Sequence, residues 1–264
     1  MSFCELNITS NFTFLTGGSH AEEYMRRAAF VGIPAIAIAD ENSVAGIVRA
    51  HTEAREIARA VRLRRAFEAE TGLVGPPAPD SLTGDLAGGF TKPVSLDVYT
   101  TPRLIPAARI VLHDGFTVTA IARDRAAWGR LSRLISLGRL RADKGSCTLR
   151  FADLIDWGEG LEMLLHPQME PQTGQQVTTL AGGAGQWDQQ AQRLTRRFPE
   201  QVSLMMAPRY DGLDLARFDR LATLAKRLGV TTVASGAPIM HHASRRKLTD
   251  VLTAVRTGVR VDAL

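Results

Sequence analysis

The chain has 264 residues, of which 45% are hydrophobic and 22% are charged, so it is long enough and apolar enough to bury one large core. No apolar run approaches the roughly 20 residues that a membrane-spanning helix needs. The N-terminal MSFCELNITSNFTF also lacks the basic and then apolar pattern of a secretory signal. We therefore expect a cytoplasmic protein that contacts no membrane.

The formal net charge is +5, and most of the positive charge is arginine. This charge is compatible with a nucleic-acid neighbour, although net charge specifies neither fold nor function. The two cysteines, Cys4 and Cys147, are far apart and form no CxxC pair, which excludes a thiolate zinc site. We expect two ordinary thiols and no disulfide in a reducing compartment.

The first 60 residues alternate between strand-like and helix-like patterns. Ser19, with Glu22 three residues later, has the spacing of a capping box and predicts the start of a helix. The apolar run AIAIA has the length and composition of a parallel strand buried on both faces. The elements predicted in this part are a strand over 4–8, a helix over 20–30, a strand over 35–39 and a helix over 44–60.

Glycine and proline interrupt this alternation over 71–93, which we interpret as a long surface excursion and not as a domain linker. A second irregular excursion lies near 167–186. Between them, His113-Asp114-Gly115 is the turn signal of a β-hairpin formed by 109–112 and 116–122. The remaining predicted elements are helices over 124–140, 151–157, 186–197, 213–228 and 244–258, and strands over 161–165, 202–206 and 230–235.

This βαβα opening is typical of layered or barrel-like α/β folds, in which ligands gather at the carboxyl ends of the strands. Two segments occupy that position in the sequence, 7–11 after the first strand and 40–43 after the second. The periodicity does not distinguish an open sheet from a closed barrel.

Two pairs of motifs carry a family resemblance. The segment ELNITSNFTFL at 5–15, followed by AIAIADENSVAG at 35–46, resembles the opening of the PHP (polymerase and histidinol phosphatase) domain of bacterial replicative DNA polymerase alpha subunits. The segments RDRAAWGRLSRL at 123–134 and RRKLTDVLTA at 245–254 are similar to the error-prone, DnaE-like branch, which works in damage-induced mutagenesis. The resemblance covers nearly the whole chain, so we expect residues 1–264 to form a single PHP domain without palm or fingers. It implies a distorted, seven-stranded β/α barrel with a metal site at the strand carboxyl ends.

Active PHP domains hold two or three metals with an H-x-H-S motif, a D-H pair, a later acidic residue and a terminal Asp-x-His. By this resemblance the first two histidines fall on Asn7 and Thr9, which are neutral and lack an imidazole. The later ligand positions have become apolar. The full set of matching positions is Asn7, Thr9, Asp40, Glu41, Met205, Ala237 and Ile239, and we expect Asn7, Thr9, Asp40, Ala237 and Ile239 to meet at one end of the fold.

The remaining ligand count is too small for a hydrolytic cluster, because a catalytic zinc alone commonly uses three protein ligands. We expect no cofactor, although Asp40 and Glu41 leave weak Mg²⁺ or Mn²⁺ binding open. The simpler interpretation of Asp40 and Asn42 is that they cap the following helix. For His241 and His242 we expect a surface or turn role, and His20, at a helix start, is expected to be solvated. His51, His113 and His166 are isolated in the sequence, and we assign them no role.

No P-loop, GxGxxG or GxSxG motif is present. The basic stretches at 62–65, 193–197 and 245–247 lack interleaved aromatic residues, so a solvated face is a simpler interpretation than contact with DNA.

Three functions remain open. We favour a non-catalytic structural and interaction domain of an error-prone, translesion DNA polymerase. Its partners would be the remaining polymerase domains, DNA through the parent protein, and other mutagenesis proteins. The alternatives are a metal-dependent phosphoesterase or 3′-5′ exonuclease, and a DNA-binding module.

Overall fold

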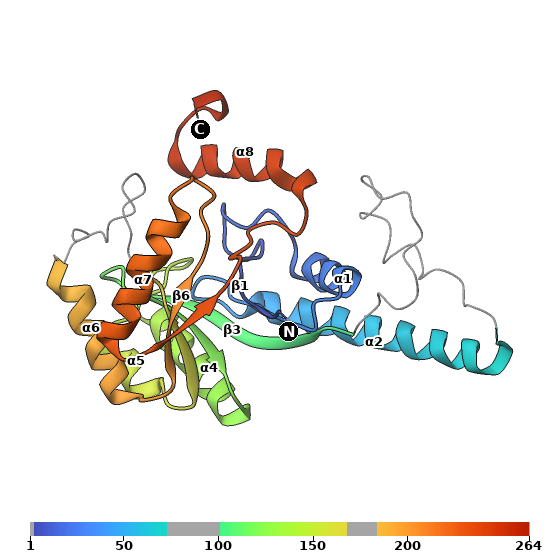
Figure 1. The fold of residues 1–264 in the computed structure, drawn as a ribbon, viewed down its shortest axis with the longest axis horizontal. Helices are drawn as coiled ribbons and strands as arrows, with labels where there is room; N and C mark the ends of the chain where they lie inside the picture. Colours follow the sequence, from blue (N-terminus) through green and yellow to red (C-terminus); the bar gives the residue numbers. More distant parts are fainter. Residues whose placement is uncertain (1–2, 73–100, 168–183, 264) are drawn as a thin grey trace. The chain divides into compact units, whose positions relative to one another are not determined.

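The computed structural model describes residues 3–72, 101–167 and 184–263, so the predicted excursions near 71–93 and 167–186 lie almost entirely outside the described residues (Figure 1). The chain divides into two compact units. The first unit comprises residues 1–40, 45–105 and 238–264, and the second comprises residues 41–44 and 106–237.

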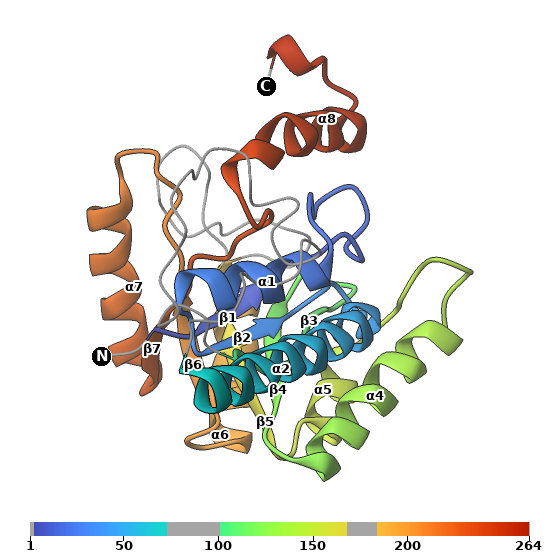
Figure 2. The ribbon, with the colours of Figure 1, turned by 90° about the vertical axis from the view of Figure 1, so that its right-hand side faces the viewer.

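The first unit pairs two short parallel strands and covers them with two helices. The continuous apolar run of the second strand is buried, as its composition predicts. The helices α1 and α2 pack against each other and against this strand (Figure 2). The elements are β1 (Glu5–Ile8), α1 (Ala21–Val31), β2 (Ala35–Ile38), α2 (Ala45–Thr71), the start of β3, and, after residue 238, η2 (Ala243–Arg245), α8 (Arg246–Thr257) and η3 (Val261–Ala263).

The second unit contains a sheet whose inner residues form one continuous apolar core. The helix α4 packs on β4, and α7 packs on β6 and β7. The elements are β3 (Arg103–Val111, from Pro106 onward in this unit), β4 (Thr117–Ala122), α4 (Arg125–Leu140), α5 (Phe151–Trp157), β5 (Leu161–Leu165), α6 (Ala184–Arg197), β6 (Val202–Met206), α7 (Asp214–Leu228) and β7 (Thr231–Ala234).

Within each unit the strands pair in chain order. The pairs β1–β2, β5–β6 and β6–β7 are parallel, whereas β3–β4 and β4–β5 are antiparallel. The predicted hairpin is confirmed, with Gly115 at a φ of 86° in its turn and the Asp114 carboxylate accepting the backbone N–H of Phe116. This mixed α/β topology agrees with the expected PHP-type architecture.

Most element boundaries lie within two residues of the predicted ones, with α2 the clearest exception. It extends to Thr71 where the sequence had suggested about residue 60. The extra turns consist of good helix formers, include the ion pair between Arg64 and Glu68, and end at Gly72, which has a φ of 66°. Among the described residues, no helix combines the length and apolar character needed to cross a bilayer.

The amphipathic helix α4 supplies a matched test of the packing in the second unit. Leu131 is fully buried in the core, whereas Leu140, on the same helix, is 81% exposed. We expect Leu131→Ala to lower the free energy of unfolding by about 2–5 kcal/mol, because it removes buried methyl groups and leaves a cavity. Leu140→Ala should change it by less than about 0.5 kcal/mol. Urea unfolding of both variants measures the difference, and equal losses would contradict the orientation of α4.

Candidate functional site

The carboxyl ends of β1 and β2 meet within the first unit and are joined there by the segment that follows residue 237. The N–H of Ala39 donates to the carbonyl of Ile8 at 2.7 Å, and the N–H of Thr9 donates to the carbonyl of Pro238 at 3.0 Å. The predicted positions Asn7, Thr9, Asp40 and Ile239 therefore belong to one end of this unit. Glu41, Met205 and Ala237 belong to the second unit.

Asp40 is the polar centre of this region and is 1% exposed. Its Oδ1 accepts the backbone N–H of Ser10 at 2.8 Å and the hydroxyl of Thr13 at 2.9 Å. Its Oδ2 accepts the hydroxyl of Ser10 at 2.7 Å. A buried carboxylate is stable only when donors replace water, and here the loop after β1 supplies three of them. The carboxylate thereby fastens this loop to the end of β2.

The first turn of α2 lies directly against the same carboxylate. A Cβ added to Gly46 would lie 2.5 Å from Oδ2 of Asp40 and 3.0 Å from Oγ of Ser10, distances that no side chain tolerates without a shift. Glycine is therefore required where the helix begins. The proximity also places a negative charge at a helix N-terminus, where the helix dipole stabilises it.

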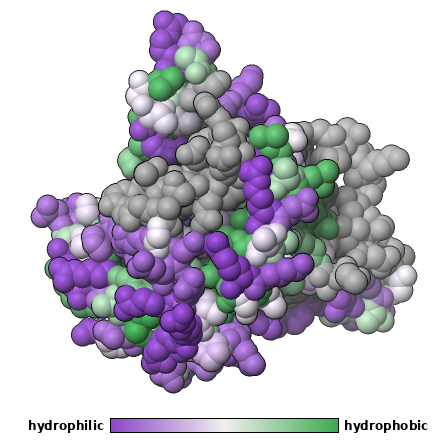
Figure 3. All heavy atoms as spheres, turned by 60° about the vertical axis from the view of Figure 1, so that its left-hand side comes forward, coloured by the Kyte–Doolittle hydropathy of each residue, from purple (hydrophilic) through white to green (hydrophobic). Residues whose placement is uncertain are grey.

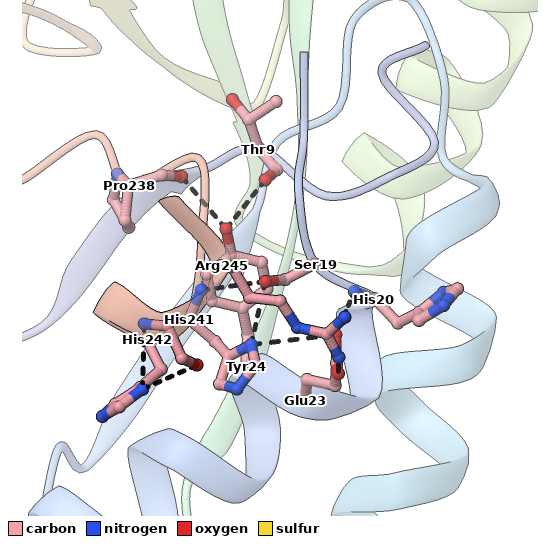
Figure 4. A network of polar contacts seen from close by, with 10 residues as sticks. Thr9, Ser19, His20, Glu23, Tyr24, Pro238, His241, His242 and Arg245 are labelled. Carbon is pink, nitrogen blue, oxygen red and sulfur yellow. Dashed lines mark hydrogen bonds and ion pairs between the residues drawn. The ribbon is translucent and has the colours of Figure 1, made fainter. Parts of the chain in front are cut away.

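Tyr24, from α1, contacts both the residue after β1 and the segment that follows residue 237. Its hydroxyl donates to the carbonyl of Thr9 at 3.1 Å and lies 3.5 Å from that of Pro238 (Figure 4). Burial, together with the charges of Asp40 and Glu23, raises the pKa of Tyr24 well above its ordinary value, so the hydroxyl remains a donor. The two matched histidine positions, Asn7 and Thr9, are both buried and both uncharged.

A second polar network joins α1 to the segment before α8, and Figure 4 shows its side chains pointing toward one another. Oγ of Ser19 lies 2.8 Å from Nδ1 of His241 and accepts the backbone N–H of His241 at 3.0 Å. Glu23 pairs with Arg245, and one of its carboxylate oxygens lies 3.7 Å from the same Nδ1. Burial lowers the pKa of His241, Arg245 acts in the same direction, and Glu23 opposes both.

This network corrects two predictions. His241 is buried and not a surface residue, whereas His242 does serve a turn, its Nδ1 accepting the N–H of Ser244. The N-cap of α1 is His20 and not Ser19, with Glu23 accepting the backbone N–H of His20 at 2.7 Å. The predicted box is shifted by one residue because the Ser19 hydroxyl is engaged by His241. The side chain of His20 is exposed, as expected.

The Ser19–His241–Glu23 arrangement differs from a catalytic triad. In a triad the serine and the carboxylate bind opposite ring nitrogens of the histidine, so that one nitrogen takes the proton and the other is oriented. Here both partners approach Nδ1, and Ser19 is 2% exposed. The network binds chain segments together and presents no exposed nucleophile.

In the second unit, Glu41 and Asn42 contact β3. Glu41 forms an ion pair with Arg109 at 3.3 Å, and its backbone forms a bridge with the same residue. The side-chain amide of Asn42 bonds both backbone groups of Val111, at 3.0 and 3.1 Å. Asn42 therefore uses its side chain to hold β3, which differs from the helix-capping role suggested for it. Its φ of 45° is one that asparagine tolerates well.

His166 is a polar residue whose position the sequence did not reveal. It follows β5, and its Nε2 lies 2.7 Å from the hydroxyl of Thr119 on β4. Burial and then the positive charge of Arg109 lower the pKa of His166 to about 3, so the ring is neutral at physiological pH. Trp187 donates its indole N–H to the backbone carbonyl of His166. The sequence signal that could have identified His166 is its position directly after a predicted strand.

The side chains of the other matched positions offer no oxygen or nitrogen ligand. Met205 lies within β6 and is buried, and Ala237 has a φ of 45° with its N–H donating to Oγ of Ser235. Across residues 3–72, 101–167 and 184–263, no group of three or more His, Cys, Asp or Glu side chains is arranged to hold a metal ion. The described residues therefore do not fit the polynuclear metal centre that the PHP resemblance implies.

The basic stretches are partly engaged within the chain. Arg64 pairs with Glu68, Arg245 pairs with Glu23, and the guanidinium of Arg193 lies over the ring of Phe151 at 5.0 Å. These arginine side chains therefore have partners within the protein, and their presence does not require a nucleic-acid ligand.

The neighbouring carboxylates Asp40 and Glu41 provide a matched test. We expect Asp40→Ala to lower the free energy of unfolding by about 2–4 kcal/mol, because it leaves buried donors of Ser10 and Thr13 without an acceptor. Glu41→Ala should cost less than about 1 kcal/mol, because its ion pair is partly solvated. Chemical denaturation at neutral pH compares the two. A loss for Asp40→Ala no larger than for Glu41→Ala would refute the anchoring role.

The lowered pKa of His166 predicts an acid-dependent loss of stability. The unfolded chain binds a proton at this residue below about pH 6.5 and the folded chain only near pH 3, so stability falls as pH decreases between these values. Between pH 6.5 and pH 5 we expect a loss of roughly 1–2 kcal/mol from this residue. Unfolding of the natural chain and of His166→Gln at both pH values isolates it. The same pH dependence in both proteins would contradict a neutral ring at position 166.

Comparison with known proteins relates the whole chain to one kind of polymerase. It is 41% identical over 272 residues to an error-prone DNA polymerase of Ruegeria pomeroyi, a match that covers 100% of this chain and 22% of that protein. It is 34% identical over 264 residues to an error-prone DNA polymerase of Rhodopseudomonas palustris, of which it covers 19%. The chain thus spans about a fifth of the length of these relatives. No protein-family model matches it.

A solved structure from Bifidobacterium adolescentis, described as a metal-dependent phosphoesterase, shares the fold with a TM-score of 0.53. The match covers 91% of this chain and 88% of that structure at 12% identity, and it supports the architecture alone. The chain is therefore similar over its whole length to one region, about a fifth, of proteins described as error-prone DNA polymerases.

Proposed function

We propose that this chain is a non-catalytic PHP domain of a translesion DNA polymerase, in which a former metal site has become a structural connection. The observation that carries the proposal is the environment of Asp40. Its carboxylate is buried and accepts hydrogen bonds from the backbone and hydroxyl of Ser10 and from Thr13. These three bonds engage both oxygens of the side chain that remains from the ligand set and make it an anchor for the loop after β1.

The second remaining carboxylate is also engaged by the protein. Glu41 pairs with Arg109, so a guanidinium supplies the positive charge that a metal would otherwise provide. A cation entering this position would have to displace Arg109 and overcome its repulsion. Weak Mg²⁺ or Mn²⁺ binding by Asp40 and Glu41 is therefore opposed at both residues.

The remaining matched positions support the same proposal through their chemistry. Asn7 and Thr9 carry no charge, and Met205, Ala237 and Ile239 have no side-chain atom that binds a hard cation. Hydrolysis of a phosphoester at neutral pH requires a water whose pKa a firmly held cation has lowered. In the part of the chain that the structure describes, no three His, Cys, Asp or Glu side chains are arranged to hold such a cation, which supports the proposal.

The wider role of the domain follows from the size of its relatives. They are about five times longer than this chain, so nucleotide incorporation would belong to the other regions of a parent polymerase. In this proposal the domain supports those regions in the cytoplasm. It meets DNA and other mutagenesis proteins through the parent protein.

The proposal predicts that the purified protein lacks phosphatase and 3′-exonuclease activity. Release of phosphate from a chromogenic ester and shortening of a labelled primer are measured with Zn²⁺, Mn²⁺ or Mg²⁺ supplied. Neither should exceed the buffer control, because the water-activating cation has no site. EDTA should leave the melting temperature unchanged, since only a ligand of the native state would stabilise it.

Restoring the matched ligands one at a time should not create activity, because each single histidine still leaves the cluster short of ligands. The combined change Asn7→His, Thr9→His, Ala237→Asp and Ile239→His is the variant to examine for metal binding, because it restores several ligands at once. Metal-dependent turnover by the natural protein, abolished by Asp40→Ala but retained in Glu41→Ala at equal folded fraction, would replace the proposal with a phosphoesterase function.

A further inference from the structure

The helix α8 has an unusual burial pattern for its length. Only Thr249 and Ala254 are buried among its twelve residues. Three of its large apolar side chains are exposed: Leu248 at 40%, Val251 at 46% and Val255 at 62%. A helix of this length is marginal in water without packing of an apolar face, so the present contacts leave much of its apolar surface uncovered.

These apolar residues form a continuous stripe. Positions 248, 251, 252 and 255 follow the spacing of one helical face, about 100° wide, which is the pattern of a helix that packs against something else. We call Leu248, Val251, Leu252 and Val255 the α8 stripe. Within the described residues of the first unit, this stripe faces solvent instead of a second layer.

The stripe continues into a pocket of about 250 Å³. Leu248 and Leu252 form one wall, and the loop after β1 forms the other through Phe14 and Leu15. Phe14 is 83% exposed at the rim. The loop is held firmly, because Gly18 donates its N–H to the carbonyl of Ile239 at 2.7 Å and a Cβ at Gly18 would lie 2.4 Å from the Thr249 methyl. The pocket is thus a built feature of the first unit.

Charge around the stripe has one dominant sign. Arg246, Lys247 and Arg256 are exposed on the helix, and Asp250 is its one acidic residue. In Figure 3, the uppermost part of the molecule, where Figure 1 shows α8 and the C-terminal turn, carries green and purple side chains next to each other. An apolar strip with a basic border is complementary to an apolar segment with acidic flanks.

We propose that the α8 stripe and its pocket are the docking surface for another region of the parent polymerase, which contributes an apolar segment flanked by acidic side chains. The relatives carry about four fifths of their length outside the part matched by this chain, so an intramolecular occupant is available. Linkage within one chain raises the effective concentration of that occupant and permits a modest interface. The inference rests on the proposed function only in requiring a longer parent protein.

Carbene photolabelling of the full-length polymerase tests the proposal. Labelling of each side chain is measured by mass spectrometry and normalised to the same protein in denaturant. We expect labelling of Leu248, Val251 and Val255 to be at least fivefold below that of the control residues Val48 on α2 and Leu215 on α7, which are 69% and 83% exposed. The reason is that only the stripe would be covered by the rest of the polymerase.

Paired substitutions in the full-length protein complete the test. Val255→Asp should restore labelling of Leu248 to the level of the controls, whereas Val48→Asp should leave Leu248 protected. Equal labelling of the stripe and the controls in the natural polymerase would overturn the proposal. So would a concentration-dependent dimer in sedimentation that Val255→Asp abolishes, since a second copy would then be the occupant. Neither result depends on metal binding or hydrolysis, so both are separate from the test of the proposed function.

Discussion

A carboxylate that is removed from water must be surrounded by donors, and the region around β1 and β2 is organised by this requirement at Asp40. The donors come from Ser10 and Thr13, about thirty residues earlier in the chain. Their positions fix the loop after β1, and that loop in turn supplies the backbone contact between Gly18 and Ile239. Gly46 is required for the same reason, because any larger residue would push α2 away from the carboxylate.

The segment before α8 is attached to the rest of the first unit by a similar polar network. Glu23 contacts both Arg245 and His241, and Ser19 forms two hydrogen bonds with His241 across 222 residues of sequence. Buried polar networks of this kind are costly unless every member is satisfied, which makes them specific. They determine where the segment before α8 lies, while α8 itself contributes few buried side chains. The position of α8 therefore depends on the polar network at its start more than on its own packing.

The strands and helices were largely predictable because their signals are local. The run AIAIA and the hairpin signal at Asp114-Gly115 each specify structure within a few residues, and the structure has β2 and the β3–β4 turn at these places. The end of α2 was missed because no breaker occurs before Gly72, and helix formers continue to that point.

The polar contacts were less predictable because their partners are distant in sequence. The spacing of Ser19 and Glu22 indicated a capping box, yet tertiary contact with His241 takes the Ser19 hydroxyl and moves the cap to His20. The contacts of His166 with Thr119 and Arg109 depend on residues more than forty positions away, so no local pattern predicts them. The family resemblance indicated which positions to inspect, but only the structure shows that Asp40 accepts hydrogen bonds from Ser10 and Thr13 and that Glu41 pairs with the guanidinium of Arg109.

Under the proposed function, these two carboxylates illustrate how hydrogen bonds and an ion pair can take the place of a metal as a link between strands. A metal binds several ligands at once and links the strands that carry them. Here the link between β1 and β2 at Asp40 is made by hydrogen bonds, and the link between Glu41 and β3 is made by an ion pair and a backbone bridge. Hydrogen bonds to a charged acceptor each contribute about 1.5–3 kcal/mol to stability. A few of them can therefore supply much of the stabilisation that a metal link between strands would give. Under the proposed function, the buried carboxylate of Asp40 must still be compensated. Hydrogen-bond donors of the protein now provide the compensation that a metal ion would otherwise provide.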